Sequence, residues 1–116
     1  MQVKYDTETD YDLIAKVLLI PEEFGGRSRP VASGYRGQFF WRINHVPTTD
    51  WDATYFFQDD PVGPGEATLA KVSISQNLKK ASQGNFPIGM QFCIREGRRV
   101  VATAVIIENR LEGDSE

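Results

Sequence analysis

The chain has 116 residues, which is room for one domain. Its formal net charge is −3 and its pI is about 5.2, so its surface as a whole does not suit nucleic acid. Its single cysteine, Cys93, excludes an internal disulfide, and no apolar run approaches the roughly 20 residues that cross a bilayer. We therefore expect one cytoplasmic domain over residues 1–116, with no signal peptide, no membrane contact and flexible ends at residues 1–10 and 112–116.

The charges alternate in sign in blocks along the chain. Residues 24–49 carry four arginines and no acid, and residues 67–107 carry a net charge of +5. The segments before, between and after these two blocks are acidic. If the two basic blocks meet in the fold, they form one positive patch on an acidic body. The alternative is a solvated surface of mixed sign, which is the commoner arrangement.

Six segments rich in β-branched and aromatic residues are predicted to be strands. They are Tyr11–Ile20, Gln38–Val46, Thr54–Gln58, Ala67–Ser75, Gly89–Arg95 and Arg99–Ile107. Pro21 ends the first strand because proline cannot donate a ladder hydrogen bond, and Gly25 opens the loop that follows. The polar segment Gln76–Pro87 is expected to be a long loop. Gly97 lies in the short turn between the last two strands, where a tight hairpin needs a positive φ.

Six antiparallel strands without a competing helix leave exposed edges unless the sheet closes. An all-β fold is therefore expected, either a small closed barrel or a tight sandwich. Strand alternation and apolar character select the expected core residues Tyr35, Phe39, Trp41, Phe92, Ile94, Val101 and Val105. Three aromatic residues near loop-like sequence, Trp51, Phe56 and Phe86, are candidates for an exposed surface.

No constellation of catalytic or metal-ligating residues stands out, so no catalytic residue, metal or cofactor is predicted. The one histidine, His45, lies in a predicted strand, where a structural role is favoured over that of a base. One cysteine and one histidine fall short of a zinc site, and a buried inert thiol at Cys93 is favoured over a catalytic Cys93–His45 pair. The clustered acids lie in turn-rich sequence, where Asp commonly accepts backbone hydrogen bonds. They are Asp50, Asp52, Asp59 and Asp60.

Three short motifs occur in a fixed order along the chain. They are GGRSRP at residues 25–30, GYRGQF at 34–39 and IREGR at 94–98, with PGE at 64–66 between them. Together they resemble the C-terminal (third) domain of bacterial translation elongation factor Tu, where the corresponding stretches read GGR-x-x-P, GYR-x-QF and RF-x-IREGGR. The resemblance extends roughly from Tyr11 to Glu108.

The resemblance implies a closed six-stranded antiparallel β-barrel that is not an enzyme, because GTP hydrolysis in the full factor belongs to a separate N-terminal domain. It also implies no nucleotide cofactor. In the family, this barrel contacts the T-stem backbone of aminoacyl-tRNA, packs against the GTPase domain and meets the nucleotide-exchange factor. The positions carried over as RNA contacts are Arg27, Gln38, Glu96 and Gly97, and the basic neighbours Arg98 and Arg99 join them. Arginine suits phosphate, while amide and carboxylate groups suit ribose and base atoms.

The chain departs from the family pattern at several positions. Pro47 stands where the family has an RNA-contacting threonine, and Arg98 replaces the second glycine of REGGR. Gly37 replaces a proline, and Cys93 replaces an alanine on the face toward the GTPase domain. The segment after Ser75 is several residues longer than in the family.

Two functions follow as expectations. The first is a non-enzymatic module that binds structured RNA, tRNA-like, through a basic patch. The second is a protein-interaction module, either a homodimer or a complex with a partner protein, that has lost RNA binding. Two site residues also have purely structural interpretations: Gly97 serves the hairpin whatever binds there, and Glu96 pairs with Arg98 or Arg99.

Overall fold

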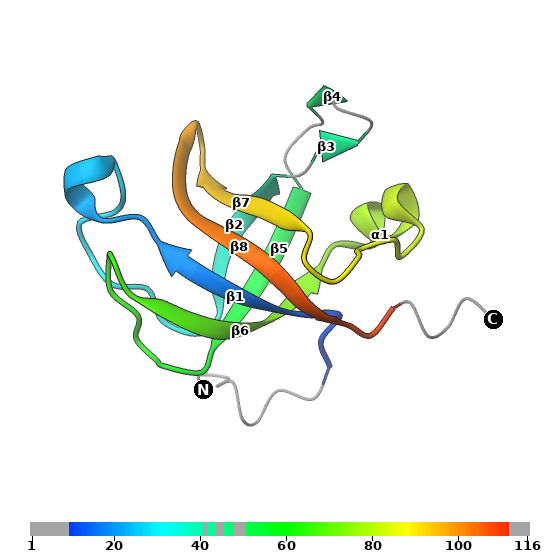
Figure 1. Ribbon diagram of the computed structural model, residues 1–116, viewed down its shortest axis with the longest axis horizontal. Helices are drawn as coiled ribbons and strands as arrows, with labels where there is room; N and C mark the ends of the chain where they lie inside the picture. The colour runs from blue at the N-terminus through cyan, green and yellow to red at the C-terminus, as the bar shows by residue number, and fades with distance from the viewer. Residues whose placement is uncertain (1–9, 41, 44–45, 48–50, 112–116) are drawn as a thin grey trace.

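The computed structural model describes residues 10–40, 42–43, 46–47 and 51–111, without the side chains of residues 40–50. Its elements are β1 (Leu13–Leu19), the 3-10 helix η2 (Glu22–Phe24), β2 (Tyr35–Phe40), β3 (Arg42–Ile43), β4 (Val46–Pro47), β5 (Trp51–Phe57), β6 (Ala67–Ile74), α1 (Gln76–Ser82), β7 (Gln91–Glu96) and β8 (Arg99–Asn109). Six strands form a closed barrel in the order β1-β6-β5-β2-β7-β8, and all their pairings are antiparallel (Figure 1). The expected closed barrel is confirmed.

Strand β1 shows how the sequence builds the barrel wall. Leu13, Ala15, Val17 and Leu19 are buried, whereas Lys16 and Leu18 are exposed. This alternation follows from the period of two in a strand, which sends successive side chains to opposite faces. β1 pairs with β6 on one side and with β8 on the other, so the first and last strands close the cylinder.

Aromatic rings fill the centre of the barrel. The rings of Phe39 and Phe92 stack with their centroids 4.0 Å apart, and Phe86 meets Phe39 edge-on at 5.8 Å. Four of the predicted core residues are buried: Phe39, Phe92, Ile94 and Val101. Tyr35 is half-buried and packs against this core, and Trp41 lies outside the described residues.

The prediction that Val105 belongs to the core is wrong. β8 has an irregular register with β7 between Ile94 and Arg95, and both Val101 and Ala102 are buried at this point. Such a bulge resets the alternation, so the buried positions that follow are Ala104 and Ile106. Val105 therefore lies on the outer face of the wall, where it is half-buried.

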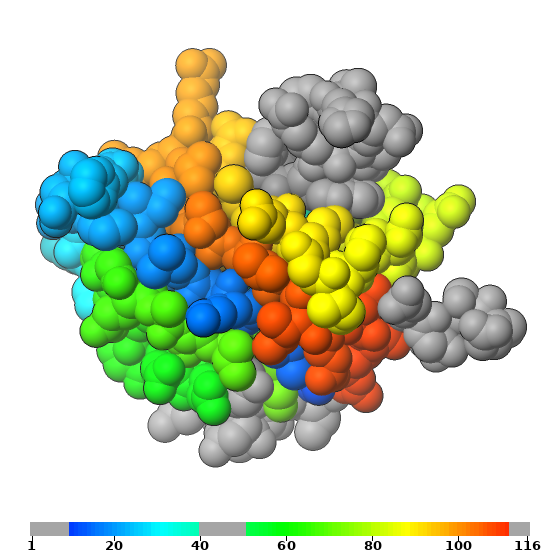
Figure 2. Space-filling view, viewed as in Figure 1, coloured from blue at the N-terminus to red at the C-terminus, as the bar shows by residue number. Residues whose placement is uncertain are grey.

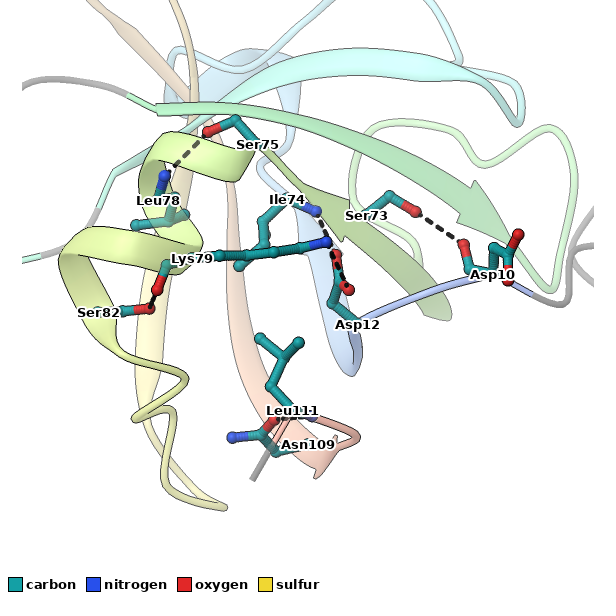
Figure 3. A network of polar contacts seen from close by, with 10 residues as sticks. All are labelled: Asp10, Asp12, Ser73, Ile74, Ser75, Leu78, Lys79, Ser82, Asn109 and Leu111. Carbon is teal, nitrogen blue, oxygen red and sulfur yellow. Dashed lines mark hydrogen bonds and ion pairs between the residues drawn. The ribbon is translucent and has the colours of Figure 1, made fainter. Parts of the chain in front are cut away.

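The segment predicted as a loop at Gln76–Pro87 contains the helix α1 instead (Figure 3). Ser75 caps it, because its hydroxyl oxygen accepts a hydrogen bond from the Leu78 backbone at 3.2 Å. Leu78 is fully buried, and Lys79 forms an ion pair with Asp12 at 3.3 Å. The same Asp12 accepts a hydrogen bond from the Ile74 backbone, so one carboxylate joins β1, β6 and the helix.

The chain after α1 continues to cover this end of the barrel. Phe86 is buried, and the Asn109 side-chain amide donates hydrogen bonds to the backbone oxygens of Gly84 and Phe86. The expectation that Trp51, Phe56 and Phe86 lie exposed is therefore wrong. Phe56 is also buried, and Trp51 is half-buried against the core. The ring of Phe86 sits inside the barrel mouth because it packs against Phe39.

The opposite end of the barrel carries the β1–β2 loop, the β5–β6 loop and the β7–β8 turn. We call it the hairpin end, formed by residues 20–34, 58–66 and 97–98. Two acids hold its loops in place: Asp60 accepts from the Ser33 backbone at 3.1 Å, and Asp59 accepts from the Thr68 hydroxyl at 3.0 Å. This use of Asp as a loop acceptor agrees with the expectation. Asp50 of the same predicted cluster lies outside the described residues.

Replacing Tyr55 by phenylalanine is expected to raise the free energy of unfolding by about 1 kcal/mol, because it removes a buried hydroxyl that has no hydrogen-bond partner in the described part of the chain. Burial also raises the pKa of Tyr55 well above 10.0. The folded protein thus keeps this proton at a pH where the unfolded chain loses it, so stability falls as the pH rises past about 10. In Tyr55→Phe the free energy of unfolding should therefore fall less steeply as the pH rises past about 10. Urea unfolding at neutral and alkaline pH measures both effects, and a less stable variant would contradict the prediction.

Candidate nucleic-acid interface

The turn between β7 and β8 presents two arginines to solvent. Gly97 adopts φ 63°, which confirms the positive φ expected for this hairpin, and Glu96 lies opposite Arg99 in the ladder. Arg98 and Arg99 are exposed, and neither forms an ion pair with another described residue. Guanidinium groups at an exposed tip can donate paired hydrogen bonds to phosphate oxygens.

Arg27 and Glu96 form an ion pair that links the β1–β2 loop to the hairpin. The Tyr35 hydroxyl donates to the same carboxylate oxygen, Oε2 of Glu96, and the Arg27 guanidinium lies 5.7 Å from the centroid of the Tyr35 ring. Arg27 Nε also donates to the backbone oxygen of Arg29 at 3.2 Å. The expectation that Glu96 pairs with Arg98 or Arg99 is wrong, because its partner comes from a different loop.

This cluster keeps the Tyr35 hydroxyl in its neutral, proton-donating form. Burial and the hydrogen bond to the Glu96 carboxylate raise the pKa of Tyr35 well above its usual value, and the positive charge of Arg27 only partly offsets them. Arg27 and Glu96 each remain about one quarter to one third exposed, so a ligand can still reach them. Their charges cancel locally, however, and the pair adds no net positive charge to the surface.

The two basic blocks of the sequence meet where β2 lies beside β7. Gln38 is opposite Arg95 in this ladder, and Arg36 continues the outward row of β2 toward the hairpin end. Gln38 Oε1 is buried and has no hydrogen-bond partner among the described residues. On its other side Gln38 lies opposite the exposed acid Asp52 of β5, which marks the edge of the basic surface.

The structure places five of the six predicted contact residues at or beside the β7–β8 turn, and Gln38 in the adjoining strand β2. Arg27, Glu96 and Gly97 are joined through the ion pair and the turn, and Gln38 lies one ladder position from the hairpin through Arg95. The residues that sequence reasoning missed are Tyr35, Arg36 and Arg95. Arg36 could have been found from its position two residues before Gln38, since alternate residues of a strand share a face.

The other candidates for chemistry contribute less. Cys93 is half-buried on β7, and His45 lies outside the described residues, so the structure does not place them as a pair. Among the residues with described positions, no three His, Cys, Asp or Glu side chains converge as metal ligands. The helices found in the described ranges are all too short or too polar to cross a membrane.

The six strands define the class of small closed antiparallel β-barrels. The chain belongs to the elongation factor Tu C-terminal domain family, whose model matches residues 7–109. Domains of this family are non-catalytic β-barrels that take part in binding tRNA and partner proteins in translation. The chain is thus a translation-related binding module by family.

Proposed function

We propose that this barrel binds structured RNA through the hairpin end. The observation that carries the proposal is the meeting of the two basic blocks, with Gln38 of β2 opposite Arg95 of β7 and the exposed Arg98 and Arg99 at the adjoining turn. Arginines in this arrangement follow a phosphate backbone and supply affinity without reading sequence. Membership of a family that binds tRNA supports the same ligand class.

The residues of this surface divide into two groups. Arg36, Arg98 and Arg99 are exposed and supply charge for phosphates. Arg27 and Glu96 hold each other and fix the β1–β2 loop against the hairpin, so they position the surface and offer a carboxylate to ribose or base donors. Since the chain is acidic overall, binding is expected to be weak and strongly salt-dependent.

Titration of the protein with a labelled tRNA at low and moderate salt tests the proposal. Replacing both Arg98 and Arg99 by alanine is expected to weaken binding and to reduce the slope of log K against log salt by about 1 for each arginine that touches a phosphate. The matched control is Lys80→Ala, which removes an exposed cation on α1 at the other end of the barrel. Absence of tRNA binding at low salt, or equally weakened binding in both variants, would reject the proposal.

Protein interaction is the second candidate function, and one observation favours it. Large apolar side chains are exposed on the outer wall and on two loops: Leu18, Phe24, Ile88, Val100 and Ile107. Contact with a partner would remove this apolar surface from water. RNA binding and protein contact use different side chains here, so the two functions are compatible.

A further inference from the structure

A groove crosses the outer face of the barrel over β6, β1, β8 and β7. Its volume is about 790 Å³, and its lining includes Lys16, Leu18, Met90, Cys93, Thr103 and Val105. The outward-facing residues lie in two rows across neighbouring strands, because Leu18 and Cys93 both lie opposite Thr103, and Lys16 and Gln91 both lie opposite Val105. The groove is thus a continuous surface of the closed sheet.

The groove is apolar and carries charge of one sign only. Leu18 is 45% exposed, although it is a large apolar side chain. Lys16 is the one charged residue among those that line the groove, and no carboxylate lines it. Lys16 forms no ion pair with any residue the structure describes. An occupant that fits this surface carries an apolar side chain next to a negative charge.

The 3-10 helix η2 carries such a group elsewhere on the same molecule. Phe24 is 75% exposed, the most exposed of the large apolar residues with described positions, and the two preceding residues are the exposed acids Glu22 and Glu23. No ion pair joins either acid to another residue in the described ranges. η2 stands out from the barrel at the left margin of Figures 1 and 2, and none of its three residues lines the groove.

From this complementarity we infer that the chain self-associates head to tail, with the Phe24 ring of one copy in the groove of a second copy. The ring meets Leu18, Cys93 and Val105 of that copy, and Glu22 and Glu23 lie near its Lys16. The contact joins two different surfaces, so a pair of copies keeps one free Phe24 ring and one free groove, and assembly proceeds to a ring or an open chain. A single aromatic ring makes a small interface, and small interfaces are weak and concentration-dependent.

Complementary variants test this geometry. Phe24→Ser removes the inserting ring, which we call the knob, and leaves the groove intact. Thr103→Tyr fills the groove at an exposed strand position and leaves the knob intact. Sedimentation velocity over a wide concentration range is expected to show species larger than the monomer for the natural sequence. In each variant alone the association constant should fall roughly tenfold or more, so that the variant stays mostly monomeric at concentrations where the natural sequence associates. An equal mixture of the two should form a heterodimer and nothing larger, because one knob and one groove survive.

Matched controls separate this contact from other apolar association. Ile88→Ser removes a side chain that is 60% exposed but lies on another loop and outside the lining, so it should associate like the natural sequence. Circular dichroism and unfolding curves confirm that each variant is folded. Association of Phe24→Ser at the natural strength would overturn the inference, as would a natural protein that stays monomeric at millimolar concentration. Failure of the mixed variants to pair would also overturn it.

Discussion

Replacing Phe39 by alanine is expected to lower the free energy of unfolding by about 3–5 kcal/mol, the range for removing a buried phenyl ring from a packed core. Phe39 is fully buried on β2, and its ring contacts the rings of Phe92 and Phe86. Alanine would leave a cavity between two strands and the segment after α1, and a closed barrel cannot collapse to fill it without shifting its ladders. Single domains have only about 5–15 kcal/mol of stability, so this variant should be close to unfolding.

Urea denaturation followed by tryptophan fluorescence measures the effect. The matched control is Leu18→Ala, which removes a large apolar side chain from the outer face of the same wall. It should cost less than about 1 kcal/mol, because Leu18 is exposed and surface changes have small effects. Similar destabilisation of the two variants would show that the centre of the barrel is not the packed core described above.

Replacing Gly26 by alanine is expected to lower the free energy of unfolding by about 3 kcal/mol or more. The cause is a steric clash of the new Cβ, since Gly26 does not have a positive φ. A Cβ at this position would lie 1.8 Å from the backbone oxygen of Ile20 and 2.6 Å from its carbonyl carbon. Backbone atoms cannot rotate away as a side chain does, so the β1–β2 loop must move as a whole. Arg27 is the next residue, and its ion pair with Glu96 should break when the loop moves.

Gly25→Ala is the control for this prediction. Gly25 has φ 95°, but nothing lies within 4 Å of a Cβ built there. Backbone strain alone should therefore lower the free energy of unfolding of Gly25→Ala by about 1–2 kcal/mol. Unfolding curves of the two variants, together with tRNA titration, separate clash from strain. A Gly26→Ala protein as stable as Gly25→Ala would contradict the close approach of this loop to β1.

Local patterns in the sequence were sufficient for much of the barrel. Strand alternation and apolar character placed Phe39 and Phe92 inside, and the turn chemistry placed Gly97 in a hairpin. Val105 was misplaced because a bulge depends on how two strands pair, and nothing local to residues 101–105 marks it. α1 was missed because it is seven residues long and buries only two of its side chains, too few to give an apolar stripe.

The contacts within the candidate interface were not predictable from the sequence. Family motifs identified Arg27 and Glu96 separately, and the structure joins them across 69 positions of the chain. That contact depends on the path of the β1–β2 loop, which Gly26 fixes through its approach to Ile20. Periodicity carries no information about such a path. The exposure of Phe24 was likewise invisible, because it depends on η2 standing away from the wall.

The pairing of β1 with β8 also has a consequence for biosynthesis. Of the six barrel strands β1 is synthesised first and its partner β8 last, so ring closure waits until residues 99–109 have been made. Until then β1 and β7 each present an open ladder of amide and carbonyl groups, the state most exposed to mispairing between nascent chains. Because its contacts are so non-local, the domain is expected to mature slowly.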